Sequence, residues 1–325
     1  MNKFNLDSTY LDRVKFFQNE GRNFENSSAW TRAAAQMFAG VCFKGKNKIQ
    51  LNLDETAVGI DLSKDYNAEN FIKIRKIKNS FYLQGRCADL ILPENTRYLI
   101  CPVIDGKKHV GAVLLDKEQK DFVLNEKTAI DPSFRVGEIK IKNLKIVDRH
   151  NLSLDKGLSI KIKKTLLDLT VFTCAGMLGA ADETLKLTID HVKKRKISDK
   201  PLSQFQTVTH RLTASYVALE KLRSLLLYVA NTLDLKQLND GSASMLKLAA
   251  NKICMDFAAV SIQLHGARAY QWVHSSSLNF KRAVFLQRLM GDSSAHQKIF
   301  MQEFQVSRSK TKKISMISTL SFRGA

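Results

Sequence analysis

The sequence is poor in the two residues that most often interrupt regular structure: its 325 residues include only four prolines and fifteen glycines. Proline breaks helix interiors and glycine weakens helices and strands, so this scarcity favours long uninterrupted elements, mostly helices. Apolar residues at 44% and charged residues at 25% are ordinary globular values and exclude wholesale disorder. A chain of this length can bury a sizeable core, and two or three domains are expected.

Acidic residues are scarce relative to basic ones. The chain carries 51 lysines and arginines against 31 aspartates and glutamates, a formal net charge of +20. This excess favours an anionic partner, which could be a nucleic acid, a membrane surface, an acidic protein or a polyphosphate such as coenzyme A. No known nucleic-acid motif and no interleaved aromatic residues accompany the charge, so nucleic acid is the less favoured partner.

Paired cysteines and metal-ligand spacings are missing. The five cysteines stand singly, without a CxxC pair, and isolated cysteines of this kind are typical of small core residues in a reducing compartment. They are Cys42, Cys87, Cys101, Cys174 and Cys254. The seven histidines show no ligand spacing with cysteine or acidic residues, so the sequence predicts no metal site.

Long apolar runs are missing as well. No window reaches the roughly 18 apolar residues that a membrane-spanning helix needs. The N-terminal stretch MNKFNLDSTYLDRVKFF lacks the unbroken apolar run of a signal peptide. The sequence therefore predicts a soluble, cytoplasmic protein with no membrane span.

A small β domain is expected over residues 53–150. From residue 68 to 147 the hydrophobic pattern is short and alternating, and DGKK with Asp105-Gly106 marks a hairpin turn. In EIKIKNLKIV the alternation slips at Lys142-Asn143, which predicts a strand with a bulge. The strands are expected to be antiparallel.

Helical spacing replaces this pattern after residue 158. The expected helices are 158–195, Pro201–Asp234, Ser242 or Ser244 to Gly266, and 278–305 with an interruption near Gly291. Four long amphipathic helices with short connections predict a four-helix bundle over residues 151–325, including a basic tail. Residues 1–52 are expected to form a shortened helical segment that leans on the β domain or on a partner. The predicted fold class is α+β.

Two stretches of the bundle resemble the C-terminal domain of the acyl-CoA dehydrogenase family. AGMLGAADETLKLTIDHVKKRKISDKPLSQFQTVTHRL is similar to the family's helix, Arg-Lys phosphate-binding turn and glutamine-bearing next helix, and KLAANKICMDFAAVSIQLHGARAY to its Gln-x-x-Gly-Gly helix end. Weaker similarities lie in LDETAVGIDLS (53–63), FYLQG (81–85) and GEIKIKNLKIV. The resemblance covers roughly residues 50–305. It implies the family's fold, acyl-CoA as substrate and FAD held at a subunit interface.

The resemblance assigns four residues to FAD. Arg195 falls where the family's arginine approaches the adenosine diphosphate part of the flavin, and Gln206 matches a nearby glutamine. Gln263 and Gly266 match the start of the adenine-side loop. A guanidinium suits phosphate oxygens, and a glycine lets backbone amides come close. Without the resemblance, the Lys-Lys-Arg-Lys run at 193–196 is interpreted as a helix end favoured by the helix dipole.

The family's catalytic glutamate is missing from both of its known locations. One location falls on Met290 or Gly291 and the other on Leu169, and none of these can take a proton. Asp292 is the only acid beside the expected site. It is a candidate base, with a helix cap after Gly291 as the favoured alternative.

Other matched positions depart from the family as well. The flavin-packing Trp-Ile-Thr/Ser stretch corresponds to DLI (89–91), and only 52 residues precede Leu53, where the family has a full helical domain. Five further matched positions hold a residue that differs from the family's usual one: Leu167, Thr170, Ser198, Ala267 and Ala269.

Three hypotheses follow. The first is an acyl-CoA dehydrogenase-like subunit that lacks its own base and pairs with a catalytic flavoprotein subunit for α,β-dehydrogenation in lipid metabolism, with FAD shared at the interface or lost. The second is a self-sufficient FAD-dependent dehydrogenase, for instance a homodimer, that uses Asp292. The third is an acyl-CoA dehydrogenase-like DNA-binding protein that uses the basic charge.

Overall fold

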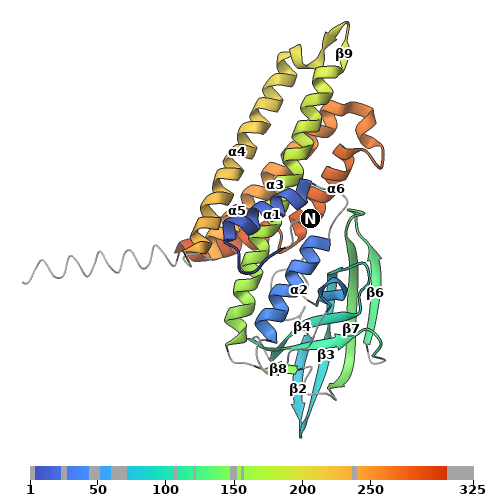
Figure 1. The fold of residues 1–325 in the computed structure, drawn as a ribbon, viewed down its shortest axis with the longest axis vertical. Coiled ribbons are helices and arrows are strands. Elements are labelled where there is room, and N and C mark those ends of the chain that lie inside the picture. Colours follow the sequence, from blue (N-terminus) through green and yellow to red (C-terminus); the bar gives the residue numbers. More distant parts are fainter. Residues whose placement is uncertain are drawn as a thin grey trace, which may run out of the picture.

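The computed structural model describes residues 4–22, 28–43, 52–59, 72–105, 108–119, 122–146, 152–154, 157–235 and 240–305. These ranges form a long helical bundle joined to a β-sheet (Figure 1). The α+β fold class is therefore confirmed. The predicted basic tail beyond residue 306, the turn at Gly106 and residues 60–63 of the stretch at 53–63 lie outside the described residues.

The sheet combines antiparallel and parallel neighbours. Its strands are β1 (Thr56–Val58), β2 (Ile72–Ile77), β3 (Ser80–Leu92), β4 (Tyr98–Asp105), β5 (Lys108–Asp116), β6 (Phe122–Thr128), β7 (Arg135–Ile146) and β8 (Leu152–Leu154). They follow the order β6-β7-β3-β2-β4-β5-β8, with β1 attached to β4. The prediction of a wholly antiparallel sheet is wrong, because β4 runs parallel to both β1 and β2. β3 runs antiparallel to β2, and β4 returns in the direction of β2. Because β4 lies beside β2 and not beside β3, the two neighbours run parallel.

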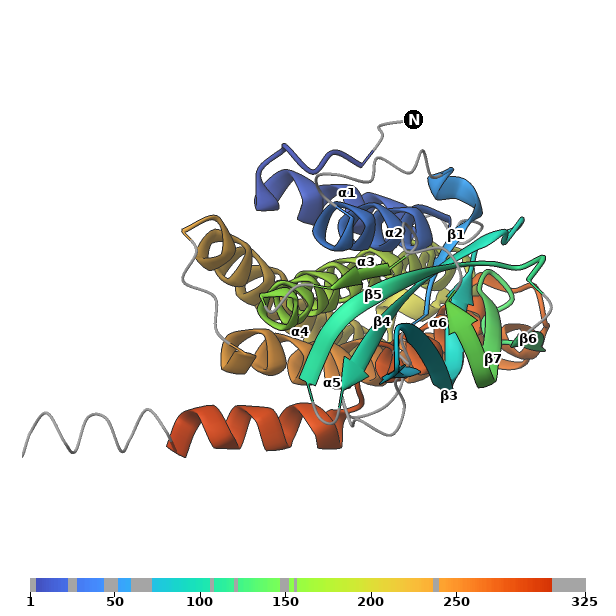
Figure 2. The ribbon, with the colours of Figure 1, turned by 90° about the horizontal axis from the view of Figure 1, so that it is seen from below.

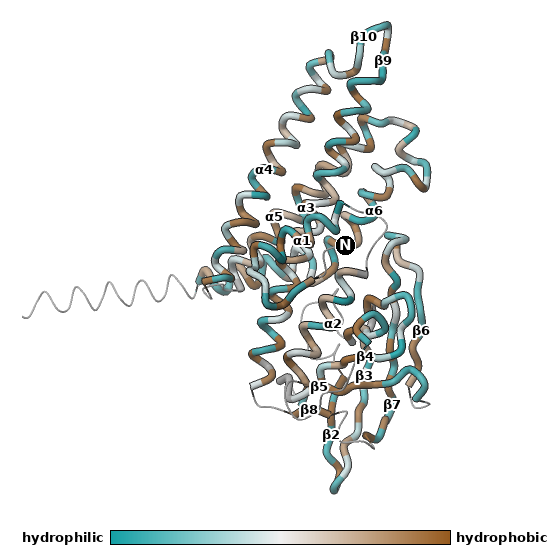
Figure 3. The backbone as a smooth tube through the Cα atoms, viewed as in Figure 1, coloured by the Kyte–Doolittle hydropathy of each residue, from teal (hydrophilic) through white to brown (hydrophobic). Residues whose placement is uncertain are grey.

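The local predictions within the sheet are confirmed. Asp105 of β4 pairs with Lys108 of β5, as the expected hairpin requires. Leu83 of β3 pairs with Leu144 and Gly85 with Ile141, so residues 142 and 143 of β7 together oppose a single residue and form the bulge. β2 alternates buried and exposed residues at its start, whereas β4, in the middle of the sheet, is buried almost throughout; Figure 3 shows hydrophobic and hydrophilic residues along the strands.

The helical part consists of seven α-helices in the described ranges. They are α1 (Tyr10–Arg22), α2 (Ser28–Cys42), α3 (Leu158–Lys194), α4 (Gln206–Asp234), α5 (Asp240–His265), α6 (Ser275–Arg288) and a last helix over 293–305. Seen from below, α3 lies between α1 and α2 on one side and α5 on the other (Figure 2). By length and composition α3 could cross a membrane, but 83% of its most apolar window is buried inside the fold. It is the central helix of the core.

One predicted helix start is wrong because a small hairpin intervenes. Pro201 lies in β10 (Lys200–Pro201), which pairs with β9 (Lys196–Ile197), and the 3-10 helix η4 (Leu202–Gln204) follows. The α-helix begins only at Gln206. Ser198 and Asp199 close the hairpin with left-handed φ angles of 48° and 60°. A turn with two positive φ angles suits an antiparallel pair of strands, and it extends the tip of the bundle.

The other helix boundaries largely agree with expectation. Within the described residues α5 begins at Asp240, so Ser244, a suggested N-cap, lies inside the helix and is buried. Gly266 follows the end of α5 with a φ of +64°, as expected for a C-cap glycine. The predicted interruption near Gly291 lies between α6 and the last helix, and Gly291 has a φ of +97°.

Two apolar clusters form the interior. The larger lies among the helices and extends onto β4 and β5, and the smaller lies within the sheet. All five cysteines are buried and none forms a disulfide, in agreement with the prediction that they are core residues. Bundle and sheet are joined by a buried ion pair between Arg282 of α6 and Asp131, whose side-chain atoms are 2.9 Å apart. Ser133 accepts from the same arginine at 2.6 Å, so this ion pair fixes α6 against the loop between β6 and β7.

Candidate functional site

A pocket of about 560 Å³ lies at the junction of α3, the β9–β10 hairpin, α4, α5 and the 3-10 helix η5 (Gly266–Tyr270). We call it the tip pocket. Its lining residues are His191, Arg195, Ile197, Leu202, Thr207, Val208, Arg211, Gln263, Leu264, His265, Gly266, Ala267 and Arg268. Its volume falls within the roughly 300–1,000 Å³ of small-molecule sites.

The lining is strongly basic. Arg195, Arg211 and Arg268 come from three different elements and are all exposed. None of the described lining residues is acidic. Apolar side chains from the hairpin, α4 and α5 complete the wall. Arginines converging from several directions without a counter-charge suit a phosphate or diphosphate group, whose oxygens the guanidinium can bind in pairs.

Three of the four residues that the sequence assigns to FAD are brought together here. Arg195, Gln263 and Gly266 line the tip pocket, from the end of α3 and the end of α5. Gln206 is exposed at the first position of α4 and does not line it, although the next residue, Thr207, does. At Gly266 an added Cβ would meet nothing within 4 Å, so the positive φ and not close packing requires glycine.

A stack of three histidines beside this pocket was not predicted as part of a site. The rings of His191 and His265 are stacked with centroids 4.3 Å apart, and His274 meets His265 edge-on at 4.9 Å. We call these three residues the histidine stack. The sequence separates them by 74 and 9 positions, and only the packing of α3 against the end of α5 brings them together. The spacing of the histidines along the chain therefore gave no indication that these three residues lie together.

The turn between α6 and the last helix places an apolar side chain where the base is expected. Met290 has a left-handed φ of 66° and is 1% exposed, with its side chain in the larger apolar cluster. Leu169, the other candidate position, is fully buried on α3. Neither side chain has an atom that can accept a proton.

Asp292 caps a helix in this structure. It is exposed, and its Oδ1 accepts a hydrogen bond from the backbone amide of Ala295 at 2.9 Å. This is the geometry of an N-cap aspartate at the start of the 293–305 helix. The carboxylate is thus engaged with the backbone amide, and the capping interpretation of the sequence fits the geometry better than the candidate base does.

Buried polar side chains of the last helix and of α5 support this turn and the end of α6. His296, on the 293–305 helix, donates from Nε2 to the Met290 carbonyl at 2.8 Å, and its Nδ1 lies 3.0 Å from the hydroxyl of Ser244 on α5. Lys247 of α5, which is fully buried, donates to the Leu286 carbonyl of α6 at 2.5 Å. Burial lowers the pKa of this lysine to about 8. The turn is thus bonded directly to the last helix and, through Ser244, to α5.

Comparisons with known proteins agree with this architecture. Residues 156–303 match the model of the acyl-CoA dehydrogenase C-terminal domain. Acyl-CoA dehydrogenase IpdE2 of Mycobacterium tuberculosis is 34% identical over 113 residues, which cover 35% of this chain and 34% of that protein. The chain thus matches about a third of the length of this relative.

Solved structures resemble the chain over nearly its whole length. The acyl-CoA dehydrogenase of Geobacillus kaustophilus superimposes with a TM-score of 0.80 at 14% identity, covering 92% of this chain and 83% of that one. A glutaryl-CoA dehydrogenase of Mycobacterium smegmatis in complex with FADH2 gives a TM-score of 0.79 at 16% identity, covering 91% and 80%. Residues 156–303 thus match the acyl-CoA dehydrogenase C-terminal domain, and the chain shares the fold of these dehydrogenases.

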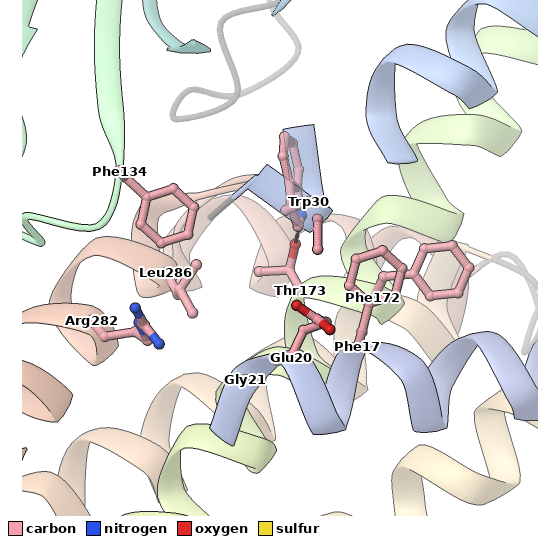
Figure 4. A pocket seen from close by; sticks show the side chains of 11 residues that line it. Phe17, Glu20, Gly21, Trp30, Phe134, Phe172, Thr173, Arg282 and Leu286 are labelled. Atoms are coloured by element: carbon pink, nitrogen blue, oxygen red, sulfur yellow. Dashed lines mark hydrogen bonds between the residues drawn. The ribbon is translucent and has the colours of Figure 1, made fainter. Parts of the chain in front are cut away.

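A small, partly open pocket of about 40 Å³ lies where α1, α2, α3 and α6 meet. It is bordered by Thr173, one turn after Leu169, and by Leu286, one turn before Met290, but neither Leu169 nor Met290 lines it. Figure 4 shows the aromatic rings among its lining side chains. They are Phe17, Trp30, Phe134 and Phe172.

Two carboxyl groups in this part of the family fold escaped sequence reasoning. Asp168, next to Leu169, is 5% exposed, and Tyr10 donates to its Oδ2 at 3.0 Å while Oδ1 has no partner. Burial raises the pKa of Asp168 to about 6, against the opposing effects of the Tyr10 hydroxyl, Lys164 and Arg13. Glu20 borders the small cavity, and burial raises its pKa too. Asp168 gave a signal in the sequence, because it is the only charged residue in TLLDLTVFTCAGMLGAA.

Proposed function

We propose that this chain is an acyl-CoA dehydrogenase-like subunit without a catalytic base, which pairs with a catalytic flavoprotein subunit and contributes the tip pocket to a shared FAD site. The buried Met290 carries the proposal. Removal of an α-proton from an acyl thioester requires a base within reach of that carbon, and both places where the family's glutamate is expected hold apolar, buried side chains.

The tip pocket supports the cofactor half of this proposal. Its three arginines carry no acidic counterpart among the described lining residues, and Gly266 presents backbone in a conformation that side chains disfavour. These features fit the diphosphate of a dinucleotide. Arg195, Arg211 and Arg268 would hold the phosphate oxygens, and Gln263 would lie beside them. FAD, when bound, supplies a hydride acceptor, which the catalytic partner would use.

The small pocket beside Thr173 and Leu286 fits this proposal, because it is too small for an acyl group. Its volume of about 40 Å³ compares with roughly 300–1,000 Å³ for sites that bury small-molecule ligands. A fatty-acyl or ring-containing acyl group would have to displace several aromatic rings of the core. The acyl-binding cavity of the assembly would therefore be that of the partner.

The first experiment is affinity purification of the tagged chain from its native host, with mass spectrometry of the bound proteins and the absorbance spectrum of the complex. We expect a second acyl-CoA dehydrogenase-type subunit and a yellow assembly that oxidises acyl-CoA with an artificial electron acceptor. The chain purified alone should be inactive. Turnover by the chain alone, abolished by Asp292→Asn, would establish instead the self-sufficient enzyme.

Arg195→Gln tests the pocket within that assembly. The variant should lower the FAD content of the purified complex at least tenfold, because a charge-assisted phosphate contact of about 1.5–3 kcal/mol is lost. Lys193→Gln is the matched control. It also removes one positive charge, two residues before Arg195, but the Lys193 side chain does not line the pocket. Equal FAD loss in both variants would mean that net charge, and not the pocket, retains the flavin.

A further inference from the structure

The histidine stack borders the tip pocket from the inside. His191 and His265 both line the pocket, and His274 packs edge-on against His265 from the segment before α6. His265 is held in place by its Nδ1, which lies 2.9 Å from the Ser261 carbonyl and 3.0 Å from the Ser276 hydroxyl. A carbonyl can only accept, so Nδ1 carries the proton.

Only one member of the stack is well placed to gain a proton. His274 accepts a hydrogen bond from the Ser276 amide through Nδ1 at 3.2 Å and caps α6, so a proton there would cost that cap. His265 is buried between the other two rings. His191 is half-buried at the pocket wall, where a bound anion would lie beside it.

The groups that act electrostatically on His191 are arginines, which are positive, and histidines, which become positive when protonated. They are Arg195 at the end of α3, His265 of α5, Arg268 of η5 and His274 before α6. Arg211 of α4 lines the same pocket, and the preceding acid on α3, Asp190, is exposed and outside the lining. Burial, followed by these neighbours, lowers the pKa of His191, and burial likewise lowers that of His274.

An anion in the pocket reverses this balance. A diphosphate carries two negative charges and would neutralise the arginines that now disfavour a protonated imidazole. The pKa of His191 then rises when the ligand binds. By linkage, a group whose pKa rises on binding takes up a proton with the ligand, so the ligand binds more tightly as pH falls through the neutral range.

We propose that the histidine stack makes the tip pocket a proton-linked diphosphate site, in which His191 gains a proton when the diphosphate of a dinucleotide binds. This inference rests on the proposed role of the pocket and adds to it a dependence on pH. The shared FAD would consequently be retained more firmly at pH 6 than at pH 8, although its diphosphate keeps the same charge over that range.

The test is isothermal titration calorimetry of the whole chain with ADP-ribose, whose diphosphate diester stays fully ionised between pH 6 and 8. We expect the Kd to rise about tenfold from pH 6 to pH 8; one linked proton allows at most a factor of ten per pH unit, or about a hundredfold over this range. At pH 7, the heat of binding should differ between two buffers of different ionisation enthalpy, which reports the proton directly.

His191→Gln should remove both signatures and leave an affinity that is flat within about twofold. His210→Gln, on the exposed face of α4 outside the pocket, is the control and should behave like the parent. Binding of ADP-ribose with a pH-independent Kd and no buffer-dependent heat overturns the proton linkage alone. No binding at pH 6 and low salt overturns the diphosphate pocket itself, and with it both proposals. Circular dichroism spectra of the variants exclude misfolding as the cause.

Discussion

Replacing Asp168 by asparagine should stabilise the protein at neutral pH, although the substitution removes a hydrogen-bonded carboxylate. The carboxyl group is 5% exposed, and its pKa rises from an ordinary value of 3.8 to about 6 on folding. Below about pH 3 it is protonated in the folded state and largely in the unfolded state, so asparagine is close to isosteric and little changes. At pH 7 the folded parent must bury an ionised carboxylate, whereas the variant buries a neutral amide whose oxygen can still accept from Tyr10.

The size of the effect follows from this difference in pKa. A difference of about two pH units at about 1.4 kcal/mol each amounts to about 3 kcal/mol. The sign follows from proton binding: between pH 4 and 6 the folded parent holds more protons than the unfolded chain, so its stability falls as pH rises. The variant has no titrating carboxyl group at this position, so it does not show this loss of stability as pH rises. About 0.5 kcal/mol of this effect is already present at pH 4, so the difference in unfolding free energy, variant minus parent, should grow by about 2–2.5 kcal/mol from pH 4 to pH 7.

Urea unfolding followed by circular dichroism at pH 4, 5, 6 and 7 measures this difference. Asp199→Asn, at the exposed turn of the β9–β10 hairpin, is the control for the loss of one surface charge. A difference between Asp168→Asn and the parent that does not change with pH would refute the reasoning, because it would mean that folding does not shift the titration of this carboxyl group.

The remaining predictions concern packing. Arg282→Met should lower the free energy of unfolding by about 3–5 kcal/mol, because it leaves the buried Asp131 carboxylate without its partner. Urea unfolding measures this, and adding Asp131→Leu should restore much of the loss; a double variant as unstable as the single one would contradict the ion-pair explanation. Gly179→Ala should destabilise the protein by more than about 2 kcal/mol, because the new Cβ would lie 1.9 Å from the Gln18 carbonyl of α1. Gly176→Ala, whose Cβ would meet its nearest neighbour at 3.9 Å, should be neutral or stabilising by up to about 1 kcal/mol, and equal melting temperatures for the two variants would refute this.

Sequence patterns predicted those parts of the fold that depend on neighbouring residues. The bulge at Lys142-Asn143 is visible in the sequence as a break in the alternation of apolar residues. The cap at Gly266 is visible because glycine is the residue best suited to a positive φ. The start of α4 was misplaced because proline also fits the short hairpin that precedes it. The parallel pairing of β4 with β2 could not be read from the strands themselves, because it depends on which side of β2 the chain crosses.

The same division holds for the candidate site. Arg195 and Gln263 were found through a resemblance in sequence, and the structure brings them to one pocket. The histidine stack and the Asp168–Tyr10 pair were missed because their members are distant in sequence and meet only through helix packing. The roles of Arg195, Gln206, Gln263 and Gly266 toward FAD, the hetero-oligomeric partner and the cytoplasmic location stay predictions.

The turn at Met290 also limits how the chain could regain the missing chemistry. A glutamate introduced there would start from backbone in a left-handed conformation, with its side chain directed among hydrocarbon groups and with the carbonyl tied to His296. A working acid at this position would require both the release of that histidine and a side chain turned outward. A single substitution of Met290 by glutamate is therefore not expected to create a catalytic base in this chain.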